Sequence, residues 1–189
     1  MTQAELDIIQ DPGYMPTGRY AFPSSYQLCS TDEAYRRLSA SLSGGLSAAQ
    51  SAAIARLENA WRMPTSQTTP DLYIKIFNDL NLYLFDDQLR NRVHVGWSNL
   101  GDLYGRTGGR TTCECCPESR VELLLDKGTF REESKAKVWG TLLHEMLHAY
   151  LFVVAERPSS HDGRFRRACR ELVEATQLEG LRFGHFMYG

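Results

Sequence analysis

The sequence of 189 residues has no long apolar run and no recognisable export signal. Its longest apolar runs, such as Ala149–Ala155, are far shorter than the roughly 20 residues that a membrane-spanning helix needs. The first residues have neither a basic region nor an apolar core, so they do not predict a secretory signal. We therefore expect an intracellular protein, nuclear or cytoplasmic, without a membrane segment.

The sequence also lacks an excess of charge of either sign. Lysine and arginine number 21 against 23 aspartate and glutamate residues, which gives a formal net charge of −2. This balance argues against a globally basic nucleic-acid binder, because no surplus of positive charge exists to neutralise phosphates. A local basic patch remains compatible with it. The one basic cluster comprises Arg164, Arg166, Arg167 and Arg170. It is either a solvated helix face that pairs with Glu171 and Glu174 or a patch that steers DNA towards an active site.

Cysteines are few, and their odd number, five, cannot be fully paired within one chain. Three of them, Cys113, Cys115 and Cys116, lie within four residues, which is poor geometry for a disulfide framework. No second cysteine pair or nearby histidine pair completes a four-ligand zinc set. We interpret the three as reduced loop cysteines and leave a pairing of Cys113 or Cys116 with Cys29 open. Cysteine usage thus agrees with a reducing compartment.

Three regions follow one another along the chain. Residues 1–30 are rich in proline, glycine, tyrosine and serine and predict an irregular arm. Residues 31–69 predict a helical extension that begins at a capping Thr31 and ends in a linker. Residues 70–189 predict a helix, a small sheet and two further helices. Because helices and strands occupy separate blocks, the fold class is α+β.

Within residues 70–189, alternating residues predict strands over Arg92–Trp97 and Val121–Leu125. The segment Gly101–Gly109 is expected to be rich in turns. A long apolar helix follows and ends near Ala155, and Thr129 is expected to cap its start in a capping box with Glu132.

This long helix contains the sequence HEMLH at residues 144–148. Residues four apart lie above one another on a helix face, so His144 and His148 can both reach one metal ion, with Zn²⁺ the default for nitrogen ligands. Glu145 lies about 100° round the helix and can act as a base on water held at the open position of the metal. The pattern indicates a zinc hydrolase, because buried polar groups without partners on so apolar a helix would be costly.

A catalytic zinc site needs a third protein ligand. Downstream of the motif, His161 follows the helix break at Pro158, and His185 lies in the C-terminal tail and is the weaker candidate. A return of the chain between two helices would bring His161 back to the motif. We interpret His94, on a predicted strand, as an exposed or sheet-packed histidine.

Several segments together resemble the SprT-like family of zinc metallopeptidases. The segment Thr141–Val153 looks like the active-site helix of that family. The other matching segments are His161–Phe165, Ile76–Asp79 with Leu84 and Phe85, Val93–Trp97 and Val121–Leu125. The resemblance covers about residues 70–178. It implies a minimal zincin-like domain, a small antiparallel sheet packed on helices, over residues 70–189.

The resemblance also implies the roles of the site residues. His144, His148 and His161 would bind Zn²⁺, and Glu145 would be the general base of a zinc metalloendopeptidase. The strand Val121–Leu125 is expected to be the sheet edge that holds an extended protein substrate.

The sequence supports one main hypothesis about function and two alternatives. We expect substrates that are DNA-associated or DNA-crosslinked proteins, and a monomer by default. The main alternative is a catalytically silent zinc-binding module that contacts DNA or chromatin, and a third is a zinc hydrolase that acts on something other than protein.

Overall fold

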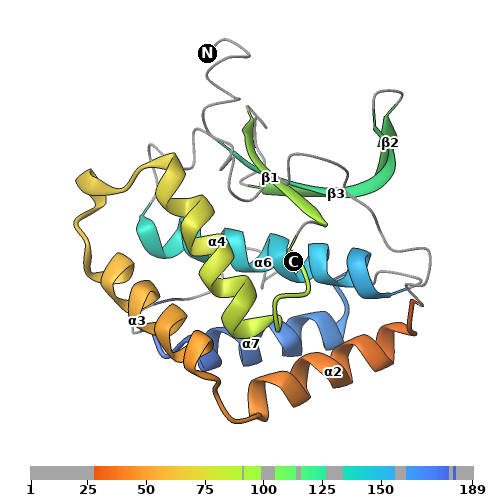
Figure 1. Cartoon of the computed structure of the whole chain (residues 1–189), viewed down its shortest axis with the longest axis horizontal. Helices are drawn as coiled ribbons and strands as arrows, with labels where there is room; N and C mark the ends of the chain where they lie inside the picture. Colours follow the sequence, from red (N-terminus) through yellow and green to blue (C-terminus); the bar gives the residue numbers. More distant parts are fainter. Residues whose placement is uncertain are drawn as a thin grey trace.

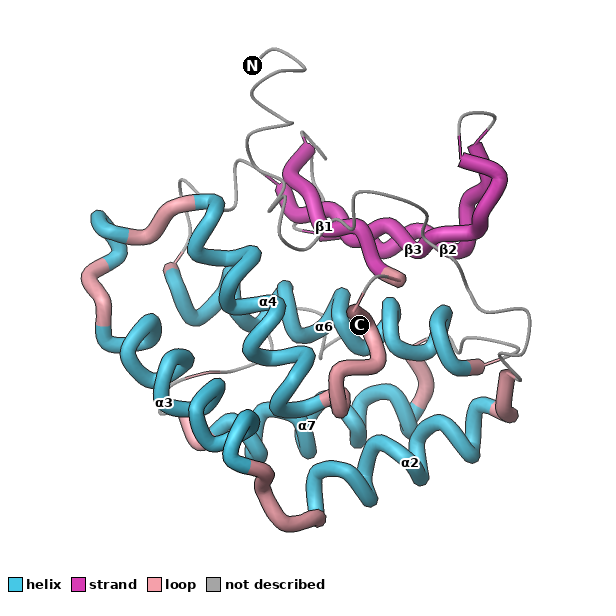
Figure 2. The backbone as a smooth tube through the Cα atoms, viewed as in Figure 1, coloured by secondary structure: helices cyan, strands magenta, loops and turns pink. Residues whose placement is uncertain are grey.

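A three-stranded sheet lies on one side of five α-helices in the part of the chain that the computed structural model describes (Figures 1 and 2). The structure describes residues 28–90, 92–98, 105–113, 116–126, 134–155, 161–178 and 181, with the backbone alone for 70, 98, 105–113 and 116–120. Residues 1–27 of the predicted arm, the candidate ligand His185 and the side chains of the three loop cysteines lie outside this description.

The elements follow the expected order of helices, strands and helices. The helices are α2 (Thr31–Ser43), α3 (Ala48–Arg62), the short 3₁₀ helix η1 (Thr65–Gln67), α4 (Pro70–Leu84), α6 (Lys135–Val154) and α7 (Gly163–Thr176). The strands are β1 (Val93–Ser98), β2 (Gly105–Cys113) and β3 (Cys116–Asp126). The α+β class is therefore confirmed.

The sheet is mixed, so the expectation of an antiparallel sheet was wrong for one of its two strand pairs. The strand order is β1-β3-β2. β2 and β3 are consecutive and pair antiparallel, whereas β1 pairs parallel with the other edge of β3, with Val93 opposite Val121. Alternation along a sequence identifies a strand but does not say which strand lies beside it or in which direction.

The expectation that Val121–Leu125 forms a sheet edge was also wrong. These residues belong to β3, which pairs with β1 through Val121–Asp126 and with β2 through residues that include Leu123 and Leu125. With neighbours on both sides, this part of β3 has no edge to offer to an extended peptide.

Helix α6 is the centre of the molecule. Fifteen of its 20 residues are buried, which a helix at the surface of a small domain cannot achieve. It contacts β2 and β3 on one side and α2 and α7 on the other. Its N-cap is Ser134, whose Oγ accepts a hydrogen bond from the Lys137 amide, so α6 begins later than predicted. The expected capping box of Thr129 and Glu132 lies outside the described residues.

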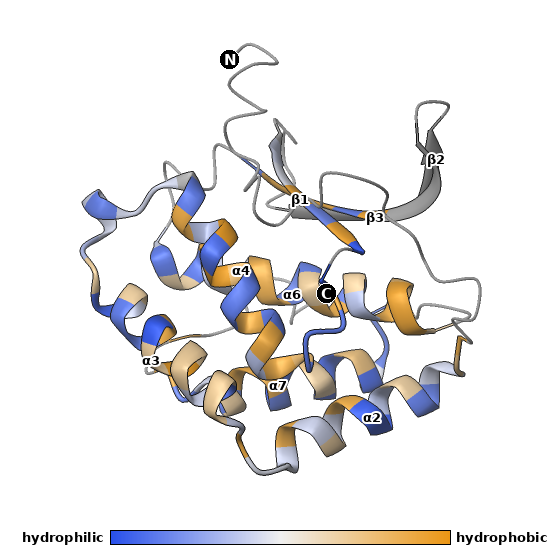
Figure 3. Cartoon of the chain, in the orientation of Figure 1, coloured by the Kyte–Doolittle hydropathy of each residue, from blue (hydrophilic) through white to orange (hydrophobic). Residues whose placement is uncertain are grey.

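Helices α2 and α3 complete the same hydrophobic core. One cluster of buried residues joins Ala34 and Leu38 of α2 and Leu57 of α3 to the residues of α4, α6, α7 and the sheet. Figure 3 shows apolar and hydrophilic patches along α2, as expected of an amphipathic helix with one buried face. The N-cap of α2 is Ser30 and not the expected Thr31.

Two contacts of aromatic residues illustrate this packing. Trp61 of α3 meets Trp139 of α6 edge to face, with ring centroids 5.2 Å apart. The Tyr150 hydroxyl donates a hydrogen bond to the Ala34 carbonyl oxygen at 3.1 Å.

Within the described ranges, no helix combines the length and the apolarity that a bilayer crossing requires.

Candidate metal centre

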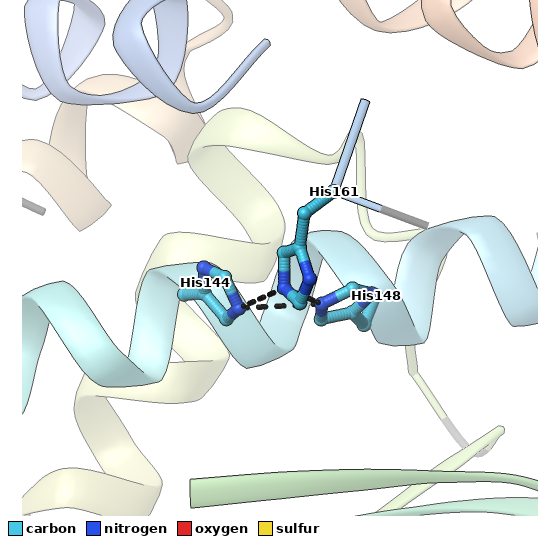
Figure 4. Close-up of side chains that lie close together, drawn as sticks. All are labelled: His144, His148 and His161. Carbon is cyan, nitrogen blue, oxygen red and sulfur yellow. Dashed lines mark hydrogen bonds between the residues drawn. The ribbon is translucent and has the colours of Figure 1, made fainter. Parts of the chain in front are cut away.

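Three histidine side chains converge beside the middle of α6 (Figure 4). His144 and His148 stand one turn apart on α6, as their spacing predicts, and their Nε2 atoms are 3.2 Å apart. The Nε2 atom of His161 lies 2.9 Å from that of His144 and 3.0 Å from that of His148. The predicted trio is therefore brought together, and His94, on β1, is not part of the group.

The third histidine is placed by the start of α7. His161 immediately precedes Asp162, the N-cap of that helix. The Asp162 side chain accepts hydrogen bonds from the amides of Arg164 and Phe165, both at 2.9 Å. A cap of this kind fixes where the chain enters the helix, so the position of His161 depends on the first turn of α7. Sequence reasoning missed the role of Asp162, although an aspartate just before a helix is a recognised capping signal.

The spacing of the three nitrogens fits a tetrahedral metal ion. Two nitrogens bound to zinc at about 2.0–2.1 Å in tetrahedral geometry lie about 3.3 Å apart. The distances of 2.9–3.2 Å are close to that value. Three neutral imidazoles cannot form hydrogen bonds between all three pairs of Nε2 atoms. Each such bond needs one donor and one acceptor, and each Nε2 atom of a neutral ring is only one of the two. A cation that accepts three lone pairs resolves the arrangement.

The surroundings keep two of the rings neutral. Burial, together with the neighbouring rings of His148 and His161, lowers the pKa of His144 to about 3. Burial and the proximity of His161 lower the pKa of His148 to about 4. Both imidazoles are therefore uncharged at neutral pH, which is the form that binds metal ions.

Phe165 forms an apolar wall behind all three rings. It is 1% exposed and lies in the first turn of α7, four residues after His161. Its ring centroid is 4.3 Å from that of His148, 5.0 Å from that of His161 and 5.1 Å from that of His144. An apolar shell of this kind limits water access and holds the rings in place.

Glu145 lies on α6 between the two ligand positions and is 5% exposed. Its position next to His144 in the sequence is the one that the HExxH pattern gives to a base. Its role as general base stays a prediction.

The basic cluster on α7 is partly neutralised. Arg164 forms ion pairs with Asp162, at 3.2 Å, and with Asp32 of α2. Arg167 pairs with Glu171 at 3.7 Å, one of the two partners expected from the sequence.

Comparison of the whole chain with known proteins gave one match. The search of curated proteins and the search of solved structures each gave no match. The SprT-like family model matches residues 73–182, which include all three histidines and more than half of the chain, and the chain therefore belongs to the SprT-like family.

Proposed function

We propose that the chain is a zinc-dependent metallopeptidase with His144, His148 and His161 as its metal ligands. The observation that carries this proposal is the convergence of the three Nε2 atoms within 3.2 Å of one another. Three histidines leave a fourth position of a tetrahedral ion open to water or substrate, as in catalytic zinc sites. Membership of the SprT-like family supports the same chemistry.

In this mechanism zinc, when bound, polarises the peptide carbonyl and lowers the pKa of the attacking water. Glu145 accepts the proton of that water and delivers it to the nitrogen of the leaving amine. Burial of Glu145 excludes competing solvent and strengthens its electrostatic interactions with the reacting groups. The ring of Phe165 contacts all three imidazoles and so holds them in their relative positions.

The proposed substrate is an extended segment of protein. β3 is interior in the described sheet, so β2 is the better candidate for backbone pairing with a substrate, since it is an outer strand of that sheet and contacts α6.

We further propose that the substrates are DNA-associated or DNA-crosslinked proteins. The support is the basic cluster on α7, the helix that begins two residues after His161. Arg166 and Arg170 form no ion pair with the described residues, in contrast to Arg164 and Arg167, and are the better candidates for phosphate contacts.

The alternative is a catalytically silent zinc module that contacts DNA or chromatin. Glu145 separates the two proposals, because a module that only binds has no need for a buried base beside the metal ligands.

The decisive experiment combines metal analysis with a cleavage assay of the purified chain and its Glu145→Gln variant. We expect about one zinc per chain in both proteins and cleavage of a protein substrate by the wild type alone. Running the assay with and without single-stranded DNA tests the substrate proposal. Folded protein without zinc would overturn the enzyme proposal, and equal cleavage by the variant would show that Glu145 is not the base.

A further inference from the structure

The three candidate ligands come from two different elements. His144 and His148 are held by one helix, so their separation is fixed by helix geometry. His161 is placed by the start of α7 instead. The shape of the metal site therefore depends on how the first turn of α7 is held relative to α6.

A segment from the N-terminal part of the chain is attached to the C-terminal end of α6. The Cys29 amide donates a hydrogen bond to the Val154 carbonyl oxygen at 2.9 Å, and the Cys29 thiol donates to the same oxygen at 3.3 Å. Cys29 also forms a parallel β-bridge with Ala155. Tyr150 lies one helical turn before Val154 on α6, and its hydrogen bond to the Ala34 carbonyl oxygen strengthens this attachment.

The same segment is attached to α7. Asp32, three residues after Cys29, pairs with Arg164 in the first turn of α7. Arg164 also binds the carboxylate of Asp162, the residue next to His161. Further along α2, the Ser39 hydroxyl donates a hydrogen bond to the Glu171 carboxylate at 2.7 Å. Figure 1 shows α2 beside α7, below α6.

We propose that residues 29–39, which we call the N-terminal strap, position His161 for metal binding. The strap contacts the end of α6 through Cys29 and the start of α7 through Asp32. His161 lies in the sequence between these two helix ends. Asp32 and Arg164 are positioning residues, because they act on the site through Asp162. This inference rests on the proposed metal site and assigns a role to a region that precedes the family match.

The size of the effect follows from exposure. Asp32 and Arg164 are 69% and 55% exposed, and ion pairs at such positions contribute little to stability. We therefore expect loss of the pair to accelerate zinc release by about two- to five-fold and not by orders of magnitude.

The test compares the full-length wild type with Asp32→Asn, Arg164→Gln and the double variant. Zinc release to a competing chelator is followed in time. We expect each single variant to release zinc faster, the double variant to be no faster than the faster single variant, and Asp32→Glu to restore the wild-type rate. Such non-additivity is expected when two residues act as one pair.

The matched control is Asp79→Asn. It breaks the ion pair between Arg56 of α3 and Asp79 of α4, whose side chains are 56% and 14% exposed, so the control removes a pair that is more buried than that of Asp32 and Arg164. This pair also ties an N-terminal helix to the rest of the chain, and its contacts within the described residues do not include Asp162 or Arg164. We expect zinc release from this variant to match the wild type.

A second readout needs no metal. Hydrogen exchange in the metal-free protein reports on the amides of Arg164, Phe165 and Arg166, all of which bond to Asp162. We expect faster exchange there in Asp32→Asn than in Asp79→Asn. Equal exchange, or equal zinc release from these two variants, would overturn the proposal. If the wild type binds no zinc, the metal site fails, and the exchange measurement still decides whether the strap holds α7.

Discussion

Phe165 stacks on His148, with ring centroids 4.3 Å apart and 28° between the ring planes. The contact joins α7 to α6 within the candidate metal centre, so the apolar packing of the two helices and the geometry of the ligands are set by the same side chain. A change in this residue is therefore expected to affect both stability and metal binding.

Replacing Phe165 with leucine should weaken zinc binding by about tenfold, because the flat ring that supports three imidazoles is lost while the site stays apolar. Competition with a chelator measures the affinity. Phe85→Leu is the matched control, because Phe85 is equally buried and packs against Tyr150. Equal weakening in both variants would mean that Phe165 acts only through general stability.

Removal of a single ligand should abolish stoichiometric zinc. Catalytic zinc needs three protein ligands, so His161→Ala should fall from about one zinc per chain to almost none after dialysis, while His94→Ala should keep its metal. Elemental analysis of the folded proteins measures the content. Retention of a full equivalent by His161→Ala would remove His161 from the ligand set.

The packing of α2 against α6 can be tested with Tyr150→Phe. The substitution keeps the ring and leaves the Ala34 carbonyl oxygen without the donor that it has at 3.1 Å. We expect a loss of about 1–2 kcal/mol in the free energy of unfolding, measured by denaturant titration. An unchanged free energy would show that water replaces the hydroxyl without loss.

Alkaline pH should destabilise the protein through Cys169. Burial raises the pKa of this thiol from its ordinary value of 9.0 to about 12. The unfolded chain then releases the proton at lower pH than the folded chain does, so the stabilising effect is complete below about pH 9 and is lost as the pH rises towards 12.

The slope attributable to this one thiol is at most about 1.4 kcal/mol per pH unit. Unfolding titrations at several pH values between 8 and 11 should therefore show a steeper decline for the wild type than for Cys169→Ala. Parallel curves would contradict the assignment.

The sequence was most informative where spacing along one helix determines geometry. The positions of His144 and His148 follow from a separation of four residues within an apolar stretch free of proline, and the structure has them as expected. His161 was harder to place, because thirteen residues and a helix break separate it from His148. Its placement relied on the family resemblance, which the match over residues 73–182 confirms.

Features that depend on long-range contacts were not predictable in the same way. The expected cap Thr31 and the observed cap Ser30 of α2 have side chains of the same capping chemistry, and tertiary packing decides between such neighbours. The first part of β2, residues 105–109, lies in the segment that was expected to be rich in turns because of its glycines, which disfavour strands. Pairing with β3 overrides this preference, and the register shifts after Gly108.

The shared core of the N-terminal helices has a practical consequence for anyone who trims the chain. A fragment cut to the family match, residues 73–182, would lose Trp61, Ala34 and Leu38. It would uncover Trp139 and Tyr150, which are buried against them. Exposed aromatic surface of this kind promotes aggregation, so the shortest soluble piece should begin before Cys29.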